Sequence, residues 1–323
     1  MTAPQVRRSR FKREETKDIK LNDRDLLILR AVHHHRFLRS THLIALTGSP
    51  EKPLLRRLHL LYHNGFLDRP RVQIDYYHRG GSKPMVYALG DRGADVLSER
   101  DGISRGKFRW SQKNLEVGRP FLEHTLAVAD FMIALELACQ QHGRIEFIPA
   151  EQVLTNAPAV TRARVLRNKE PFSWHVPLMH NGERHSVGII PDGVFGLRYL
   201  DRPEGRNRAF FFLEMDLSTM SVAAKSLRKS SILKKLLAYH ASWLQGLHEK
   251  HFGVPNCRTL FVTTSHERVQ NFIAAAKTVV LAKPGTRTGK TFLFTEHDNI
   301  SPNTFFTLGW QNAIDEEPVT LGL

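Results

Sequence analysis

Two short motifs place carboxylates inside apolar runs that are otherwise typical of buried strands. The first is Ile190-Pro191-Asp192-Gly193 and the second is Phe212-Leu213-Glu214-Met215-Asp216. A buried charge is costly unless it is paired, hydrogen-bonded or bound to a metal. Residues two apart in a strand share a face, so Glu214 and Asp216 are expected to project together. If the two strands are neighbours, Asp192 joins them. Oxygen ligands of this kind suit Mg²⁺ or Mn²⁺, and the predicted metal ligands are therefore Asp192, Glu214 and Asp216.

The charge of the chain favours a polyanionic partner. Its 323 residues include 47 Lys and Arg against 32 Asp and Glu, a formal net charge of +15. The length favours two domains. The positive field favours double-stranded DNA as the partner over an acidic protein or an anionic membrane.

Cysteines and apolar runs exclude several classes. With only Cys139 and Cys257, neither a disulfide framework nor a cysteine-based zinc site is expected. No apolar run approaches the length that spans a membrane. The N-terminal residues lack the apolar segment of a signal peptide. We therefore expect a cytoplasmic protein without membrane contact.

The first hundred residues predict a winged helix. Residues 1–20 are basic, with almost no apolar side chains, and are predicted to form a disordered arm. From residue 21, the apolar spacing predicts helices over about 22–35, 42–47 and 50–63. Extended segments over 69–77 and 84–89 flank the turn Arg79-Gly80-Gly81-Ser82 and predict a hairpin. This order predicts a winged helix-turn-helix over 21–100, a fold that binds DNA or, alternatively, proteins.

The third predicted helix would enter the major groove, and the hairpin would contact the backbone or the minor groove. The side chains predicted to bind DNA are cationic or titratable and lie on this helix, at its exit or in the hairpin. They are Lys52, Arg56, Arg57, His59, Arg69, Arg79 and Lys83.

The rest of the chain predicts a linker over 101–118, a nuclease-like α/β domain over 119–300 and a C-terminal tail over 301–323. In this domain we predict a helix at 121–142, a strand at 144–148, a largely irregular segment at 151–186 with strand pieces around 172–176, and strands at 187–199 and 209–216. A long helix at 223–248, a strand at 259–264, a helix at 267–276 and a strand at 292–295 follow. The core order is α-β-β-β-α-β, an α/β sandwich. The fold class of the whole chain is α+β.

This order and the carboxylate motifs resemble nucleases of the PD-(D/E)xK type. The resemblance implies that Asp192 and Glu214 hold a divalent cation that activates water and stabilises charge on the scissile phosphate. Asp216 stands where these nucleases carry a lysine. Lys235 on the next helix, four residues before Tyr239, could reach back in its place, as could Lys225 or Lys229. The predicted catalytic residues are Asp192, Glu214 and Lys235, and Glu123 or Glu136 could add a carboxylate.

The alternative interpretation of the carboxylates is structural. Asp216 would then cap the turn before Ser218, and Glu214 would pair with a nearby basic side chain. On this interpretation the domain is a scaffold that contacts DNA or a protein, since fold alone does not fix function.

A series of short motifs also runs through residues 21–265. They are Asp25-Leu26-Leu27-Ile28-Leu29-Arg30-Ala31-Val32, Arg56-Arg57-Leu58, Gly65-Phe66-Leu67, Tyr87-Ala88-Leu89-Gly90-Asp91-Arg92-Gly93-Ala94, Glu123-His124-Thr125-Leu126-Ala127-Val128-Ala129-Asp130-Phe131, the two carboxylate motifs with Thr219, and Lys235-Leu236-Leu237-Ala238-Tyr239. In order and spacing they resemble the plasmid replication-relaxation family of mobile genetic elements. The resemblance implies a DNA-binding accessory protein of a plasmid, conjugative element or phage, acting in replication, relaxation or mobilisation. It also implies association with the bacterial nucleoid or a plasmid.

Partners and rival functions follow from the same resemblance. A relaxase, a replication protein or another mobile-element protein would be the protein partner, and a homodimer stays open. The leading hypothesis is DNA binding without catalysis. The alternatives are a Mg²⁺- or Mn²⁺-dependent DNA endonuclease, a nickase using Asp192 and Glu214, and a winged-helix transcriptional regulator.

Overall fold

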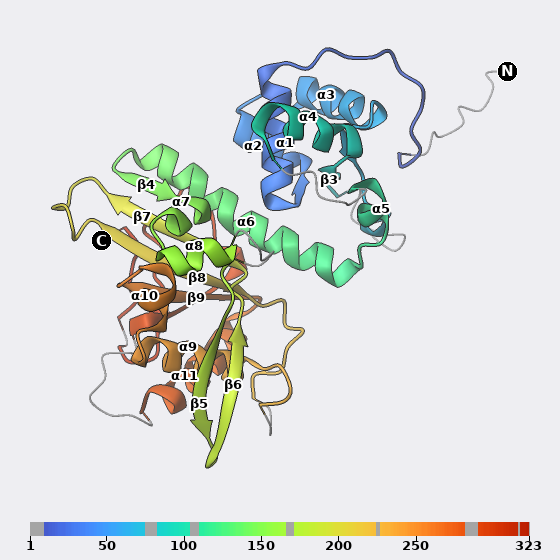
Figure 1. Ribbon diagram of the computed structural model, residues 1–323. Coiled ribbons are helices and arrows are strands. Elements are labelled where there is room, and N and C mark those ends of the chain that lie inside the picture. The colour runs from blue at the N-terminus through green and yellow to red at the C-terminus, as the bar shows by residue number, and fades with distance from the viewer. Residues whose placement is uncertain are drawn as a thin grey trace. The chain divides into compact units, whose positions relative to one another are not determined.

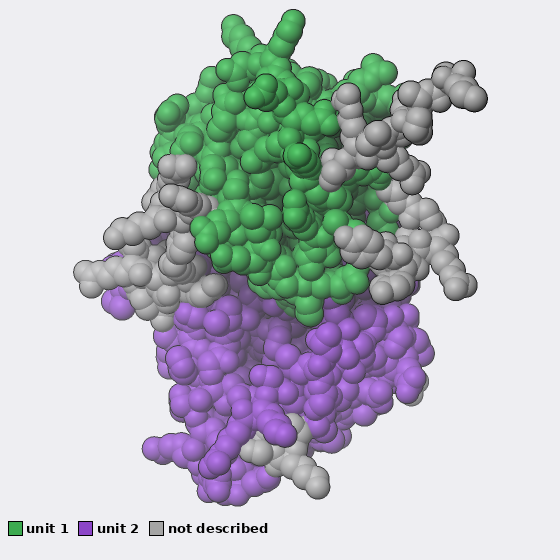
Figure 2. Space-filling model, turned by 90° about the vertical axis from the view of Figure 1, so that its right-hand side faces the viewer, with its two compact units in different colours: residues 1–130 green, residues 131–323 purple. Residues whose placement is uncertain are grey.

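The computed structural model describes residues 10–74, 83–103, 110–165, 171–223, 227–281, 290–315 and 317–322. It confirms a mixed α+β fold (Figure 1). The chain divides into an N-terminal unit, residues 1–130, and a C-terminal unit, residues 131–323 (Figure 2). Among the described residues, no helix combines the length and the apolar composition needed to cross a membrane.

The N-terminal unit begins with α1, α2 and α3 and, among its described residues, also holds three short strands and further helices. Its elements are α1 (Asp23–His35), β1 (Phe37–Arg39), α2 (Ser40–Thr47), α3 (Glu51–His63), β2 (Leu67–Asp68), the 3-10 helix η1 (Arg71–Gln73), β3 (Val86–Leu89), α4 (Asp91–Asp101), α5 (Trp110–Leu115) and the first half of α6 (Arg119–His142). Strand β3 lies between β1 and β2 in an antiparallel sheet. The predicted hairpin turn at Arg79 lies outside the described residues. The extended segment predicted over 69–77 is wrong at residues 71–73, which form η1, and the strand β2 ends before it at Asp68.

Polar contacts at the start of α1 join it to α3. Asn22 accepts the N–H of Asp25, and the Asp25 carboxylate accepts the N–H of Asn22, a capping box that satisfies two N-terminal donors. The same carboxylate is fully buried and also receives the guanidinium of Arg57 from α3. The helix start and the helix packing therefore depend on one acidic side chain.

The segment before α1 differs from the predicted disordered arm. Over residues 10–20 it lies against α3 and β2, where Arg13 donates to the carbonyl of Tyr62 and pairs with Asp68. The N–H of Glu14 donates to His63 Nδ1 at 2.8 Å. The basic composition predicted solvation, but these partners lie about fifty residues away in the chain, so local composition did not indicate them.

The C-terminal unit is built on a six-stranded sheet in the order β11-β10-β9-β8-β7-β4. Its strands are β4 (Ile145–Ile148), β7 (Gly193–Tyr199), β8 (Arg208–Met215), β9 (Cys257–Thr263), β10 (Phe292–Glu296) and β11 (Gln311–Asn312). Strands β4, β7 and β8 pair antiparallel, whereas β8, β9 and β10 pair parallel. The helices of this unit are the second half of α6, α7 (Ala150–Thr155), α8 (Ala159–Val165), α9 (Ile232–Leu244), α10 (Leu247–Phe252) and α11 (His266–Leu281), with the 3-10 helix η3 (His297–Asn299).

The two faces of this sheet bury different aromatic clusters. On one face Phe195 and Phe211 stack, and Phe131 of α6 packs on Phe195. On the other face Phe212 contacts Tyr239 of α9, and Phe261 contacts Phe272 of α11. Because strand side chains alternate, Glu214 shares the α9 face with Phe212.

Three predicted segments differ from the structure. The predicted strand 187–199 is broken at residues 190–192, and β6 (Glu183–Ile189) pairs instead with β5 (Trp174–His180) in a separate hairpin beside α9 (Figure 1). Its turn has positive φ at Asn181 and Gly182, as a two-residue turn of the Asn-Gly type requires, so 151–186 is not largely irregular. The predicted helix 223–248 is shorter, because Ser231 caps α9 and Gly246 adopts φ 62° after it.

The predicted tail 301–323 belongs to the C-terminal unit. Trp310 is fully buried and exchanges backbone hydrogen bonds with Val319. Residues 311–312 add strand β11 to the edge of β10. The apolar side chains of this segment are therefore part of the core of the C-terminal unit.

Candidate functional site

Glu214 is the centre of the carboxylate cluster. It lies one residue before the end of β8 and its side chain is 3% exposed. Lys235 Nζ donates to Oε2, and the Tyr239 hydroxyl donates to Oε1 at 2.5 Å. Both donors come from α9, where residues four apart share a helix face. Both oxygens of the carboxylate are therefore engaged by one helix.

Burial and pairing shift the pKa values of this group in a coupled way. Burial raises the pKa of Glu214 to about 7, against the opposing effect of Lys235. Burial lowers the pKa of Lys235, but the charges of Glu214, Asp192 and Asp216 and the hydrogen bond to Glu214 together outweigh burial, so that the pKa of Lys235 is raised. Burial also raises the pKa of Tyr239, which stays a neutral donor. Near neutral pH, Lys235 therefore keeps its proton while Glu214 titrates beside it.

Asp192 lies beside Glu214, as predicted from the two motifs. Its backbone N–H donates to the carbonyl of Leu213 at 2.9 Å, and its Oδ2 accepts the N–H of Met215 at 2.8 Å. Asp192 thus extends the β7–β8 pairing past Gly193 and flanks Glu214. Its negative charge contributes to the raised pKa of Glu214.

Asp216 is held by a different set of donors. Arg268 of α11 makes a two-pronged ion pair with it, and Thr263 Oγ1 and the N–H of Ser218 donate to Oδ2 at 2.7 and 3.1 Å. Burial acts to raise the pKa of Asp216, but these hydrogen bonds outweigh burial and lower it. Arg268 also donates to the carbonyl of Met220, so the pair fixes the chain after β8.

The predicted metal site is not assembled. Within the described part of the chain, Asp192, Glu214 and Asp216 do not bring one ligand atom each within 4.8 Å of one another. Asp216 follows the last residue of β8 and is taken by Arg268, while both oxygens of Glu214 accept donors. A divalent cation needs lone pairs, and here it would have to displace the Lys235 ammonium. The residues as they lie do not fit Mg²⁺ or Mn²⁺.

The three lysines considered as partners of Glu214 lie in different places. Lys235 reaches Glu214, whereas Lys229 is exposed before the helix and Lys225 lies outside the described residues. A cavity of about 130 Å³ opens beside Glu214, Lys235 and Tyr239. It is smaller than the roughly 300 Å³ at which pockets for small organic ligands begin.

On α3 the structure separates the predicted DNA-binding residues into two groups. Lys52, Arg56 and His59 are exposed and follow a spacing of four and three residues, so they form one row on the helix. Arg57 does not belong to this row. Its Nε and Nη2 donate to the two oxygens of Asp25, Nη2 also donates to the carbonyl of Lys20 at 2.8 Å, and its side chain is 18% exposed.

The predicted DNA-binding residues beyond α3 also include both packed and exposed side chains. The Arg69 guanidinium lies 4.2 Å from the ring centre of Tyr62 and donates to the carbonyl of Arg10. It is thus a packed side chain at the exit of α3. Lys83 is exposed three residues before β3, and Arg79 lies outside the described residues. We call Lys52, Arg56 and His59 the exposed row.

Two residues that form ion pairs with predicted site residues, Asp25 and Arg268, were not predicted from the sequence. Asp25 carries a weak signal, since an acidic residue three positions after Asn22 is the mark of a capping box. Arg268 carries none, because it lies 52 residues after Asp216 and on an amphipathic helix whose other charges are exposed.

Comparisons with curated proteins and with solved structures found no match. The model of the replication-relaxation family matches residues 29–256, which is more than half of the chain. That span runs from α1 to just before β9 and includes the exposed row, Asp192, Glu214 and Lys235. The chain is a member of the replication-relaxation family.

Proposed function

We propose that this protein binds duplex DNA as an accessory factor in the replication, relaxation or mobilisation of a plasmid or other mobile element. Membership of the replication-relaxation family indicates a role in replication or relaxation of such an element. The observation that carries the DNA-binding proposal is the exposed row on α3. A net charge of +15 supports it, because such a field attracts polyanions.

The winged-helix interpretation rests on the order of elements over residues 21–100. Helices α1, α2 and α3 are followed by β2 and β3, and β1 precedes α2. A winged helix uses its third helix to enter the major groove. On this proposal Lys52, Arg56 and His59 face the DNA, Lys83 and Arg79 contact its backbone from the hairpin, and Arg57 and Arg69 hold α3 in place.

The C-terminal unit would serve as a nuclease-like scaffold rather than as a nuclease. The order α6-β4-β7-β8-α9-β9, with β8 and β9 parallel, supports the PD-(D/E)xK interpretation of its fold. The donors on Glu214 and Asp216 support a structural role for both carboxylates. On this proposal residues 119–300 and the following segment contact DNA or a mobile-element protein.

The first test is duplex binding under increasing salt. We expect fluorescence anisotropy to show affinity that falls steeply with salt, because phosphate contacts release counterions. The double variant Lys52→Glu/Arg56→Glu should lose about 100-fold or more in affinity, at roughly 1–3 kcal/mol for each lost contact. Arg100→Glu, an exposed cation on α4, is the matched control. Equal losses in both variants, or binding insensitive to salt, would contradict a contact through α3.

A second test concerns cutting. Supercoiled plasmid incubated with the protein and Mg²⁺ or Mn²⁺ should stay supercoiled, because Lys235 and Tyr239 occupy the oxygens of Glu214. Gel electrophoresis measures this directly. Nicking by the wild-type protein that disappears in Asp192→Ala would instead establish the endonuclease alternative.

A further inference from the structure

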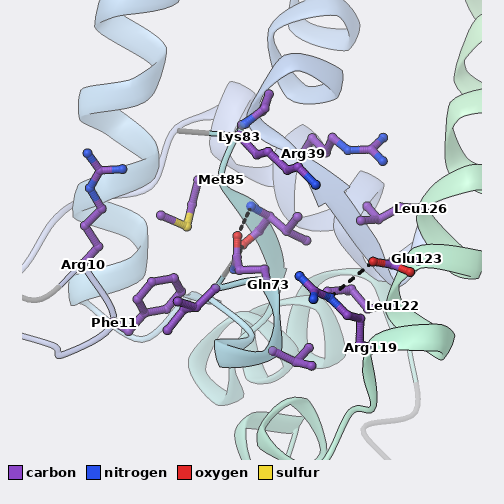
Figure 3. Close-up of a pocket in the computed structure, with 14 residues that line it drawn as sticks. Arg10, Phe11, Arg39, Gln73, Lys83, Met85, Arg119, Leu122, Glu123 and Leu126 are labelled. Atoms are coloured by element: carbon purple, nitrogen blue, oxygen red, sulfur yellow. Dashed lines mark hydrogen bonds and ion pairs between the residues drawn. The ribbon is translucent and has the colours of Figure 1, made fainter. Parts of the chain in front are cut away.

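A cavity of about 280 Å³ lies in the N-terminal unit, away from the exposed row. It is lined by the segment before α1, the end of β1, the residues around η1, the approach to β3 and the first turns of α6. Figure 3 shows Phe11 and Met85 on one side of it and Arg39 and Arg119 on the other. We propose that this cavity receives one unpaired nucleotide of a DNA strand that continues from the bound duplex. The inference rests on the proposed function.

The charge of the lining selects an anion. Of the described residues that line the cavity, Arg10, Arg39, Lys83 and Arg119 are cationic and Glu123 alone is acidic. Glu123 is one helical turn from Arg119 and pairs with it at 3.3 Å. Asp130, outside the lining, pairs with Arg39. Four cations against these two carboxylates leave a positive formal charge, which favours a phosphate among small ligands.

The floor of the cavity selects a ligand that also has an apolar face. Phe11, Met85, Leu122 and Leu126 line it, and Leu126 is buried beneath the surface. Aromatic side chains next to cations are the combination on which unpaired bases stack while their phosphates are neutralised. Methionine sulfur also packs favourably on aromatic rings.

The amide of Gln73 does not read a base edge. Its Oε1 accepts the N–H of Val86 at 2.7 Å, and its Nε2 donates to the carbonyl of Val86 at 3.0 Å. This pairing fixes the wall between η1 and β3. The cavity therefore offers charge and stacking rather than base-specific hydrogen bonds, so any base would be accepted.

Size and continuity favour a nucleotide over an acidic peptide. The cavity of about 280 Å³ is close to the roughly 300 Å³ at which pockets for small organic ligands begin, which is room for one nucleotide and not for several. Lys83 belongs both to this lining and to the proposed duplex contacts. The segment that supplies Phe11 continues through Glu14, whose N–H donates to His63 of α3. The segment that lines the cavity therefore also contacts α3, the helix proposed to hold the duplex.

The test compares a blunt duplex with the same duplex carrying a short 5′ or 3′ single-stranded tail that contains 2-aminopurine. One of the tails should raise affinity by about tenfold, the gain expected from stacking of one base. The fluorescence of 2-aminopurine should change on binding. Phe11→Ala and Arg119→Ala should lose the gain but keep blunt-duplex affinity, since both side chains lie at the surface or are only half-buried. Arg100→Ala is the charge control.

The outcomes separate this inference from the proposed function. A tail gain lost only in Phe11→Ala and Arg119→Ala supports it. No gain in the wild-type protein, a gain kept in both variants, or an equal loss in Arg100→Ala overturns it while leaving duplex binding intact. Loss of duplex binding in the α3 variants with tail binding unchanged supports the cavity. Tail binding displaced by a glutamate-rich peptide but not by a mononucleotide assigns the cavity to a protein and overturns the inference.

Discussion

Replacing Arg57 by alanine is expected to lower the free energy of unfolding of the N-terminal unit by about 3–5 kcal/mol, the usual cost of breaking a buried ion pair. Asp25 is fully buried and receives both arms of the guanidinium, so the substitution leaves an uncompensated carboxylate in the interior. Native-state hydrogen exchange of peptides from α1 and α3 measures the change without interference from the C-terminal unit.

The neighbouring residue provides the control. Arg56 is exposed, and Arg56→Ala should change stability by no more than about 0.5 kcal/mol, as for most surface substitutions. Its effect should appear in duplex affinity instead. If Arg57→Ala left exchange unchanged and weakened DNA binding as much as Arg56→Ala, Arg57 would be a DNA contact and the structural assignment would be wrong.

The second large effect concerns Glu214 and pH. Its pKa is raised by burial from 4.5 to about 7. Between these values the unfolded chain has released the proton and the folded chain retains it, so stability contributed by Glu214 is present at low pH and is lost as pH rises. The free energy of unfolding of the wild-type protein, minus that of Glu214→Gln, should therefore fall by about 3 kcal/mol across this range, at about 1.4 kcal/mol per pH unit.

Urea titrations followed by tryptophan fluorescence measure this difference, since Trp174 packs on Phe212 and Tyr239 near the site. Taking the difference removes contributions common to both proteins, including that of His35, whose pKa burial lowers to about 3. Glu249→Gln, an exposed glutamate on α10, is the matched control. Parallel curves for the wild-type protein and Glu214→Gln would show that Glu214 keeps an ordinary pKa in the folded state.

Local patterns in the sequence predicted most of the elements but not all of their limits. The apolar spacing of α1, α3 and α6 was sufficient because one side of each helix is buried, and the continuous apolar runs of β7 and β8 were sufficient because both faces of their sheet are buried. Strand pieces were predicted around 172–176, where β5 lies, but its pairing with β6 in a hairpin was not predicted, although Asn181-Gly182 signalled the turn. The length of α9 was overestimated although Ser231 and Gly246 marked both ends. Both features therefore have local signals in the sequence, a turn of the Asn-Gly type and the residues that bound the helix.

The carboxylate cluster shows a limit of a different kind. Placing Asp192 next to Glu214 required only that two strands be neighbours, and Lys235 with Tyr239 followed from helical spacing. The separation of Asp216 from Glu214 depended on Arg268, which approaches from a helix beyond the next strand. The alternation of side chains along a strand predicts that Glu214 and Asp216 point the same way. It does not predict which side chains pair with them.

The segment after η3 affects how the chain is synthesised. Phe305 and Trp310 pack on Phe131 of α6, and Tyr199 donates to the carbonyl of Leu321. While the chain has emerged from the ribosome only as far as residue 300, one aromatic face of the sheet lacks its cover and β10 is an open edge. Open edges pair readily with other chains. The nascent C-terminal unit would therefore be most prone to aggregate just before these last strand and core residues emerge.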